Sequence, residues 1–185
     1  ALIVSDERAS VAAVFTRSSV VGAPVEVSRA RVKRGFARGV VVNSGCSNVA
    51  MGARGIRDAH TMARYAAKAI GCDDSDVLLA STGVIGQPLP LDVLRLGIPQ
   101  AAAALSSDGF ADAAEAIRTT DTFAKVASVR LALGGETVTL QGIAKGAGMI
   151  EPNMATMLAF LATDARVSPA LLRGMLRRVA DSTFN

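Results

Sequence analysis

Residues 128–144 read "SVRLALGGETVTLQGIA" and carry the clearest structural signal in the chain. Val129, Leu131 and Leu133 alternate with other residues up to Gly134-Gly135, and a similar alternation follows the glycines. A period of two is typical of a β-strand that buries one face. Two consecutive glycines can adopt the positive φ angles that a two-residue turn needs. The stretch therefore predicts a β-hairpin.

The segments on either side of this hairpin predict a mixed α/β chain. Strands are expected at residues 1–5, 10–16, 39–45, 76–81 and 154–163, and helices at residues 55–71, 91–105, 109–119 and 168–181. The last helix would begin with Ser168 as its N-cap and Pro169 at its first position. It would bury a stripe formed by Leu171, Leu172, Met175 and Val179. Several strands are apolar throughout, which indicates burial on both faces. Such strands need layers above and below, so we expect sheets sandwiched between helices in a single domain over residues 1–185.

Composition excludes several classes of protein. Of 185 residues, 50% are hydrophobic and 19% are charged, which is typical of a globular domain. The net charge is +4, but the basic cluster "RARVKR" at 29–34 lacks aromatic residues, so a solvated face explains it better than nucleic-acid binding. The sequence contains no uncharged apolar run long enough to span a membrane. Two cysteines and one histidine form no metal-ligand pattern and suit a reducing, cytoplasmic compartment, so we expect no metal or cofactor.

Two glycine-containing loops follow predicted strands and could form part of a site. In "STGVIG" at 81–86, consecutive backbone N–H groups leaving a strand could hold a carboxylate, a phosphate or an oxyanion. The alternative is a plain strand-to-loop turn. The loop "NSGCSNVAMGARG" at 43–55 could line a pocket, but it matches no nucleotide-binding motif. In "RTTDTFAK" at 118–125 the hydroxyls could bind a polar substrate, or they could simply cap a helix and form a turn.

Residues 145–164, "KGAGMIEPNMATMLAFLATD", place Thr156 where a glycine-rich turn becomes an apolar run. The alternative is an ordinary strand threonine. A bent backbone at Ala155 would let the Thr156 hydroxyl attack the carbonyl just before it. Cleavage of the Ala155–Thr156 bond would give Thr156 a free α-amine, whose pKa near ~7.7–8.0 suits a base for its own hydroxyl. Lys145 could place a cation near this nucleophile, or it could be an exposed loop lysine.

The chain resembles the ornithine acetyltransferase family, also called glutamate N-acetyltransferases. The resemblance is carried by "ALIVSDERASVAAVFT", "GVVVNSG", "STGVIGQPLP", "TTDTFAK" and above all "KGAGMIEPNMATMLAFLATDA", which follow one another in the family's order. It implies an α/β/β/α layered sandwich, similar in layout to N-terminal-nucleophile hydrolases but differently connected. Family members continue beyond the position of Asn185, so this chain is expected to be a fragment.

The resemblance also implies a mechanism. The chain would cleave itself at Ala155–Thr156, leaving residues 1–155 in an α chain and residues 156–185 at the start of a β chain. Thr156 would be the nucleophile that carries the acetyl group from N-acetylornithine to glutamate in a ping-pong reaction. Thr82 and Gly83 match the oxyanion-hole pair, and Thr119, Lys145 and Thr156 match substrate-contacting positions. The α and β chains would assemble as an α2β2 heterotetramer or a larger oligomer.

Two other functions remain open at this point. A self-processing aminopeptidase or amidase of the same architecture would use water where the transferase uses glutamate. A non-catalytic relative would bind a small molecule with the same fold and never cleave itself.

Overall fold

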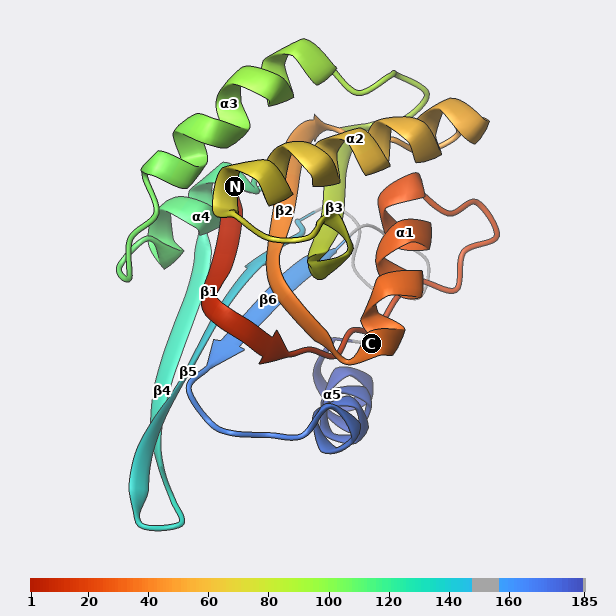
Figure 1. The fold of residues 1–185 in the computed structure, drawn as a ribbon. Helices are drawn as coiled ribbons and strands as arrows, with labels where there is room; N and C mark the ends of the chain where they lie inside the picture. Colours follow the sequence, from red (N-terminus) through yellow and green to blue (C-terminus); the bar gives the residue numbers. More distant parts are fainter. Residues whose placement is uncertain (148–156, 185) are drawn as a thin grey trace.

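The computed structural model describes residues 1–147 and 157–184 (Figure 1). Its helices and strands follow the chain in a mixed order. They are β1 (Leu2–Ser10), α1 (Ala23–Arg31), β2 (Phe36–Cys46), α2 (Gly52–Ile70), β3 (Val77–Val84), α3 (Leu91–Ala103), α4 (Phe110–Ala116), β4 (Lys125–Leu133), β5 (Glu136–Lys145), β6 (Leu158–Thr163) and α5 (Pro169–Thr183). Short 3-10 turns at Val32–Arg34 and Asp74–Asp76 follow α1 and precede β3.

The strands form two three-stranded sheets. In the first sheet, with the order β1-β2-β3, β1 is antiparallel to β2, and β2 is parallel to β3 through the crossover helix α2. In the second sheet, β4, β5 and β6 form an antiparallel meander. The hairpin predicted at residues 128–144 is confirmed: Leu133 pairs with Glu136 across Gly134-Gly135.

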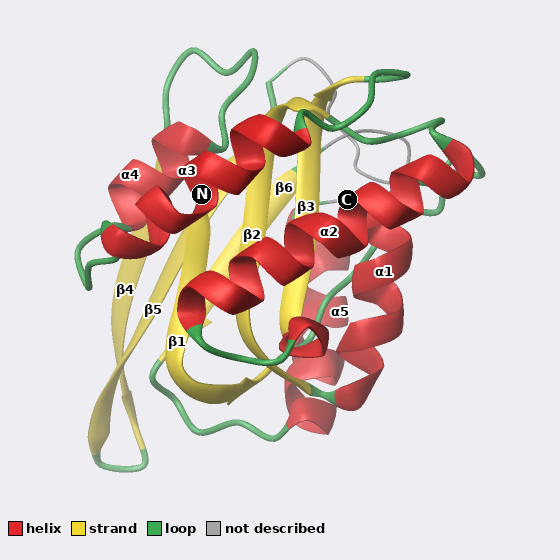
Figure 2. Cartoon of the chain, turned by 45° about the horizontal axis from the view of Figure 1, so that its top comes forward, coloured by secondary structure: helices red, strands yellow, loops and turns green. Residues whose placement is uncertain are grey.

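Helices cover one face of the first sheet, and the second sheet covers the other (Figures 1 and 2). The helix-side core joins Val41, Val77 and Leu79 to an alanine-rich face of α2 that includes Ala63 and Ala66. Small side chains let a helix approach a sheet closely, which suits a chain that is only 4% aromatic.

A second core lies between the two sheets. It joins Val42 of β2 and Ile143 of β5 to Ala114 of α4 and to the adjacent Ile117, with Phe160 packed against them. Because strand side chains alternate between faces, Ala80 and Thr82 of β3 point toward this inter-sheet layer together. The predicted α/β class is therefore confirmed, with two stacked sheets and helices over the outer face of the first sheet.

The predictions of elements differ from the structure at several places. Residues 1–5 and 10–16 were expected to form two strands, but the structure has one strand, β1, whose pairing with β2 shifts between Val4 and Ala9. The polar residues between the two expected strands do not end β1, because β1 is an edge strand and its outer side tolerates a bulge. The strand predicted at residues 76–81 also continues past residue 81, to Val84, as β3.

Burial in the C-terminal part is lower than predicted. The strand expected to be buried on both sides, β6, leaves Leu161 51% exposed. The proposed inner stripe of α5 is likewise exposed at Leu171, Met175 and Val179. The helix itself is confirmed, with the Ser168 hydroxyl accepting a hydrogen bond from the Leu171 amide.

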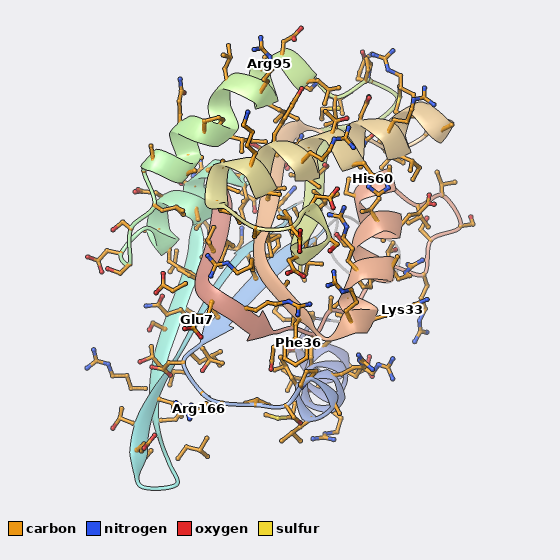
Figure 3. The ribbon with its side chains drawn as sticks, in the orientation of Figure 1. Glu7, Lys33, Phe36, His60, Arg95 and Arg166 are labelled. Atoms are coloured by element: carbon orange, nitrogen blue, oxygen red, sulfur yellow. The ribbon has the colours of Figure 1, made fainter. Side chains whose placement is uncertain are left out.

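The basic cluster at 29–34 is only partly a solvated face. Lys33 is exposed below α1 (Figure 3). Arg31 is buried and donates a hydrogen bond to the carbonyl of Val77 at 2.6 Å, so it ties α1 to the first sheet. Because its guanidinium is bound inside the fold, Arg31 is not available to bind a polyanion such as a nucleic acid.

Candidate active site

Three segments that are far apart in the sequence meet between the two sheets. Thr82 lies near the end of β3, Thr119 follows α4, and Lys145 is the last residue of β5. Lys145 shares the inner face of its strand with Ile143, and Thr82 faces it from the first sheet. The stacking of the sheets thus brings together side chains that no local pattern connects.

The ammonium group of Lys145 binds two hydroxyl groups. Its Nζ lies 2.8 Å from Oγ1 of Thr82 and 2.8 Å from Oγ1 of Thr119, and the residue is only 5% exposed. Burial lowers the pKa of Lys145, the negative charge of Asp121 raises it, and the positive charge of Lys125 adds to the lowering. Since the ammonium donates to Thr82, the Thr82 hydroxyl can direct its own proton toward another acceptor.

Asp121 is a buried carboxylate beside this cluster. Its Oδ1 accepts hydrogen bonds from Nζ of Lys125 at 2.6 Å and from the backbone amide of Gly146 at 2.7 Å. Burial by itself would raise the pKa of Asp121, but the hydrogen bonds from Lys125 and Gly146 and the charges of Lys125 and Lys145 bring it to about 2. The other oxygen, Oδ2, is buried without a hydrogen-bond partner among the described residues.

Gly83 follows Thr82 at a close contact between two backbones. Its φ is +132°, and a Cβ at this position would lie 2.2 Å from the carbonyl carbon of Gly45 in β2. The two residues are paired in the register of the parallel strands. A residue with a side chain would push β2 and β3 apart, so glycine is required for the backbone to pass here.

The structure therefore brings Thr82, Thr119 and Lys145 into direct contact, with Gly83 adjacent to Thr82. Ala155 and Thr156, the predicted cleavage site and nucleophile, lie outside the described residues. The next residue, Met157, is described and packs beside Gly146, where a Cβ would lie 3.3 Å from Cγ of Met157. The chain thus returns to the neighbourhood of Lys145 directly after Thr156.

Sequence reasoning missed Asp121. For residues 118–125, the sequence pattern suggested a role for the hydroxyl groups. In the structure, the Asp121 carboxylate accepts two hydrogen bonds beside the cluster. The available signal was the spacing of Asp121 and Lys125, which places opposite charges four residues apart.

The loop at 43–55 uses its polar side chains to hold its own backbone. Asn43 donates from Nδ2 to the carbonyl of Cys46 at 2.7 Å, and Asn48 donates to the carbonyl of Gly55 at 2.9 Å. A pocket lined in part by Asn43 and Ser44 lies against α3, and its lining does not include Lys145. The loop does line a pocket, as expected, but this pocket is separate from the Lys145 cluster.

The remaining candidate groups have structural partners. Nδ1 of His60 lies 3.4 Å from the guanidinium of Arg31, and Sγ of the buried Cys46 lies 3.2 Å from the carbonyl of Gln87. Across residues 1–147 and 157–184, no three His, Cys, Asp or Glu side chains are arranged to hold a metal ion. None of the helices described is long and apolar enough to cross a membrane.

Comparison with known proteins adds a family to this geometry. The sequence model of the ArgJ family matches residues 1–185. The arginine biosynthesis bifunctional protein ArgJ of Symbiobacterium thermophilum is 53% identical over 185 residues, and that of Geobacter sulfurreducens is 50% identical over 185 residues. These alignments include 100% of this chain but only 46% and 47% of the relatives, so the chain spans about half their length.

Two solved structures are similar in fold. The arginine biosynthesis bifunctional protein of Bacillus halodurans superposes with a TM-score of 0.77 at 41% identity, over 83% of this chain and 81% of that one. Ornithine acetyltransferase from Mycobacterium tuberculosis, solved in complex with ornithine, superposes with a TM-score of 0.76 at 32% identity, over 85% and 82% of the two chains.

Proposed function

The chain belongs to the ArgJ family, and from this we propose that it is part of an acetyltransferase that moves the acetyl group of N-acetylornithine to glutamate. The observation that carries the proposal is the Lys145 ammonium held between the hydroxyls of Thr82 and Thr119. These are residues that the family resemblance assigns to substrate contact and oxyanion stabilisation, and they come from three separate segments of the fold.

Self-cleavage would prepare the nucleophile. The Thr156 hydroxyl attacks the carbonyl of Ala155, and water hydrolyses the resulting ester, which leaves a free α-amine on Thr156. Residues 1–155 then belong to one chain, and residues 156–185 begin the other. In this proposal the two chains assemble into an α2β2 heterotetramer or a larger oligomer in the cytoplasm.

The transfer would then run in two half-reactions. The Thr156 oxygen bonds to the acetyl carbon of N-acetylornithine while its proton moves to the Thr156 amine. The C–N bond breaks, and ornithine leaves with that proton. The amine of glutamate attacks the acetyl ester in turn and releases Thr156 unchanged, so no cofactor is consumed.

Thr82 and Gly83 suit the stabilisation of the oxyanion in both steps. Because Lys145 occupies a lone pair of Thr82 Oγ1, the Thr82 proton is free to point at a developing negative charge. The backbone N–H of Gly83 supplies a second donor. Loss of one such donor reduces rates on the order of 10²–10³-fold. The ammonium itself would attract the substrate carboxylate and favour the neutral form of the Thr156 amine.

The test is the intact mass of the full-length protein after exposure to N-acetylornithine. We expect a chain that starts at Thr156 and is heavier by one acetyl group, and we expect Thr156→Ala to remain uncut and unacetylated. Thr163→Ala is the matched control, because Thr163 lies in β6 and bonds to the carbonyl of Thr139 instead. An uncut wild-type chain that never accepts acetyl would refute the proposal. Release of acetate without glutamate as the main product would favour a hydrolase.

A further inference from the structure

Asp121 connects two chain segments at the edge of the proposed active site. A single carboxylate oxygen accepts from Lys125, the first residue of β4, and from the amide of Gly146, the residue directly after β5. Lys145 is the last residue of β5, is paired with Leu158 of β6, and directly precedes this anchored amide. The hydrogen bond that Gly146 donates therefore fixes the chain directly after Lys145.

The electrostatic environment of Lys145 also depends on Asp121. The ammonium is buried, and its described hydrogen-bond partners are the hydroxyls of Thr82 and Thr119, which carry no charge. A buried ammonium is costly without a negative charge nearby. Among the described residues, Asp121 supplies the negative charge that acts on Lys145.

Only one oxygen of the Asp121 carboxylate accepts hydrogen bonds within the described residues. Asp121 is 5% exposed, and its Oδ2 is buried with no hydrogen-bond partner in the described part of the chain. An unsatisfied buried polar atom costs on the order of 1–3 kcal/mol. The hydrogen bonds that lower the pKa of Asp121 to about 2 also stabilise the fold, so a readout other than stability is needed to identify a positioning role.

We propose that Asp121 is a positioning residue for acetyl transfer, which binds the Gly146 amide and Lys125 through one oxygen and so holds the Lys145 ammonium against Thr82. The inference rests on the proposed function. Asp121 itself does not touch the reacting atoms; it acts through Lys145.

Two variants of the Asp121–Lys125 pair separate this role from a general loss of structure. Among the described residues, the charged groups that act on Lys145 are Asp121 from the α4–β4 connection and Lys125 from β4. Asp121→Asn keeps an acceptor oxygen for Gly146 but removes the negative charge, so the pKa of both Lys145 and the proposed Thr156 amine should fall. Lys125→Gln removes a positive charge, so the pKa of both should rise. A merely structural pair would instead lower activity in both variants without moving their pH optima in opposite directions.

The experiment is the pH profile of acetyl transfer by the full-length enzyme. We expect the optimum of Asp121→Asn to move to lower pH with kcat reduced by up to roughly 10²-fold, which is the cost of a small misplacement at a reactive centre. The optimum of Lys125→Gln should move to higher pH. Asp121→Glu should keep the wild-type optimum, because it retains the charge, but lose rate, because the longer side chain displaces the Gly146 amide.

Controls keep this test separate from the proposed function. Asp112→Asn on the exposed face of α4 makes the same charge change and should leave the profile unaltered. If the wild-type enzyme forms no acetyl-threonine, the proposed function fails first. If the wild type is acetylated but Asp121→Asn and Lys125→Gln keep its optimum, the positioning role is wrong. Should Asp121→Asn fail to fold, an unmoved optimum in Lys125→Gln overturns the proposal on its own.

Discussion

Gly83 limits how the end of β3 can be built. Its backbone passes so close to Gly45 that even a methyl group would overlap the carbonyl carbon at 2.2 Å, and its φ of +132° is rarely adopted by other residues. The neighbouring side chain, Thr82, is 1% exposed and directed at Lys145. The direction of the Thr82 hydroxyl therefore depends on a residue that has no side chain.

We expect Gly83→Ala to destabilise the full-length protein by roughly 2–5 kcal/mol, the sum of backbone strain and overpacking. Gly86→Ala is the matched control: its φ is also positive, at +76°, but nothing lies within 4 Å of the added methyl group. Its cost should be about 1–2 kcal/mol, from conformation alone. Urea-induced unfolding measures both variants, and equal losses would show that the contact with Gly45 yields easily.

Among the elements, the β4–β5 hairpin has its turn at one end and the proposed active site at the other. Its tip is Gly134-Gly135, with φ angles of +60° and +87°, and its other end carries Lys125 and Lys145 (Figure 1). The tip projects away from the sheets, so changes there should affect strand pairing and leave the chemistry at Lys145 intact.

Two substitutions at Gly134 test whether the turn needs a residue that tolerates positive φ. Gly134→Asn should cost little, because asparagine tolerates the left-handed region and favours this type of turn. Gly134→Val should destabilise the hairpin by about 1–3 kcal/mol, because a β-branched residue is strained at positive φ. Hydrogen exchange of the β4 and β5 amides measures the difference. Equal protection in the two variants would mean that the turn adopts another conformation.

The same element marks what the sequence could and could not predict. Alternation and a Gly-Gly pair specify a hairpin locally, so it was predicted together with its turn. The helix at 168–181 was predicted for a similar reason, from Ser168 and Pro169 at its start. Burial was not predictable in this way: β6 and the stripe of α5 are apolar, yet Leu161 and Leu171 are each more than half exposed among the described residues.

The site was less accessible to local reasoning than the fold. Thr82 and Lys145 are 63 residues apart, and Thr119 and Lys145 are 26 apart, so their contacts depend on the stacking of the sheets. No spacing rule connects such residues, and the roles expected of them came from the family resemblance. Asp121 was missed because a lone aspartate among threonines is typical of a turn. Its hydrogen bond from the Gly146 amide, 25 residues further along the chain, becomes visible only in three dimensions.

In the whole molecule, one face of the second sheet is exposed among the described residues. Val129, Leu131 and Leu133 share the face opposite Ile143, and each is more than two-fifths exposed, at 44%, 49% and 61%. Contiguous exposed apolar side chains mark contact surfaces. Since the curated relatives are about twice as long as this chain, we expect residues of the full-length protein to pack on this face.

Strand pairing has a consequence for a cut protein. The first fragment would contain β5 and the second β6, and these strands are hydrogen-bonded neighbours from Leu140↔Thr163 to Lys145↔Leu158. We expect the two fragments of the full-length protein to elute together from a sizing column in native buffer and to separate only in detergent. Fragments that part in native buffer would contradict this expectation. Cleavage between the two strands would then break the chain without breaking the strand pairing, so the start of β6 would remain beside β5.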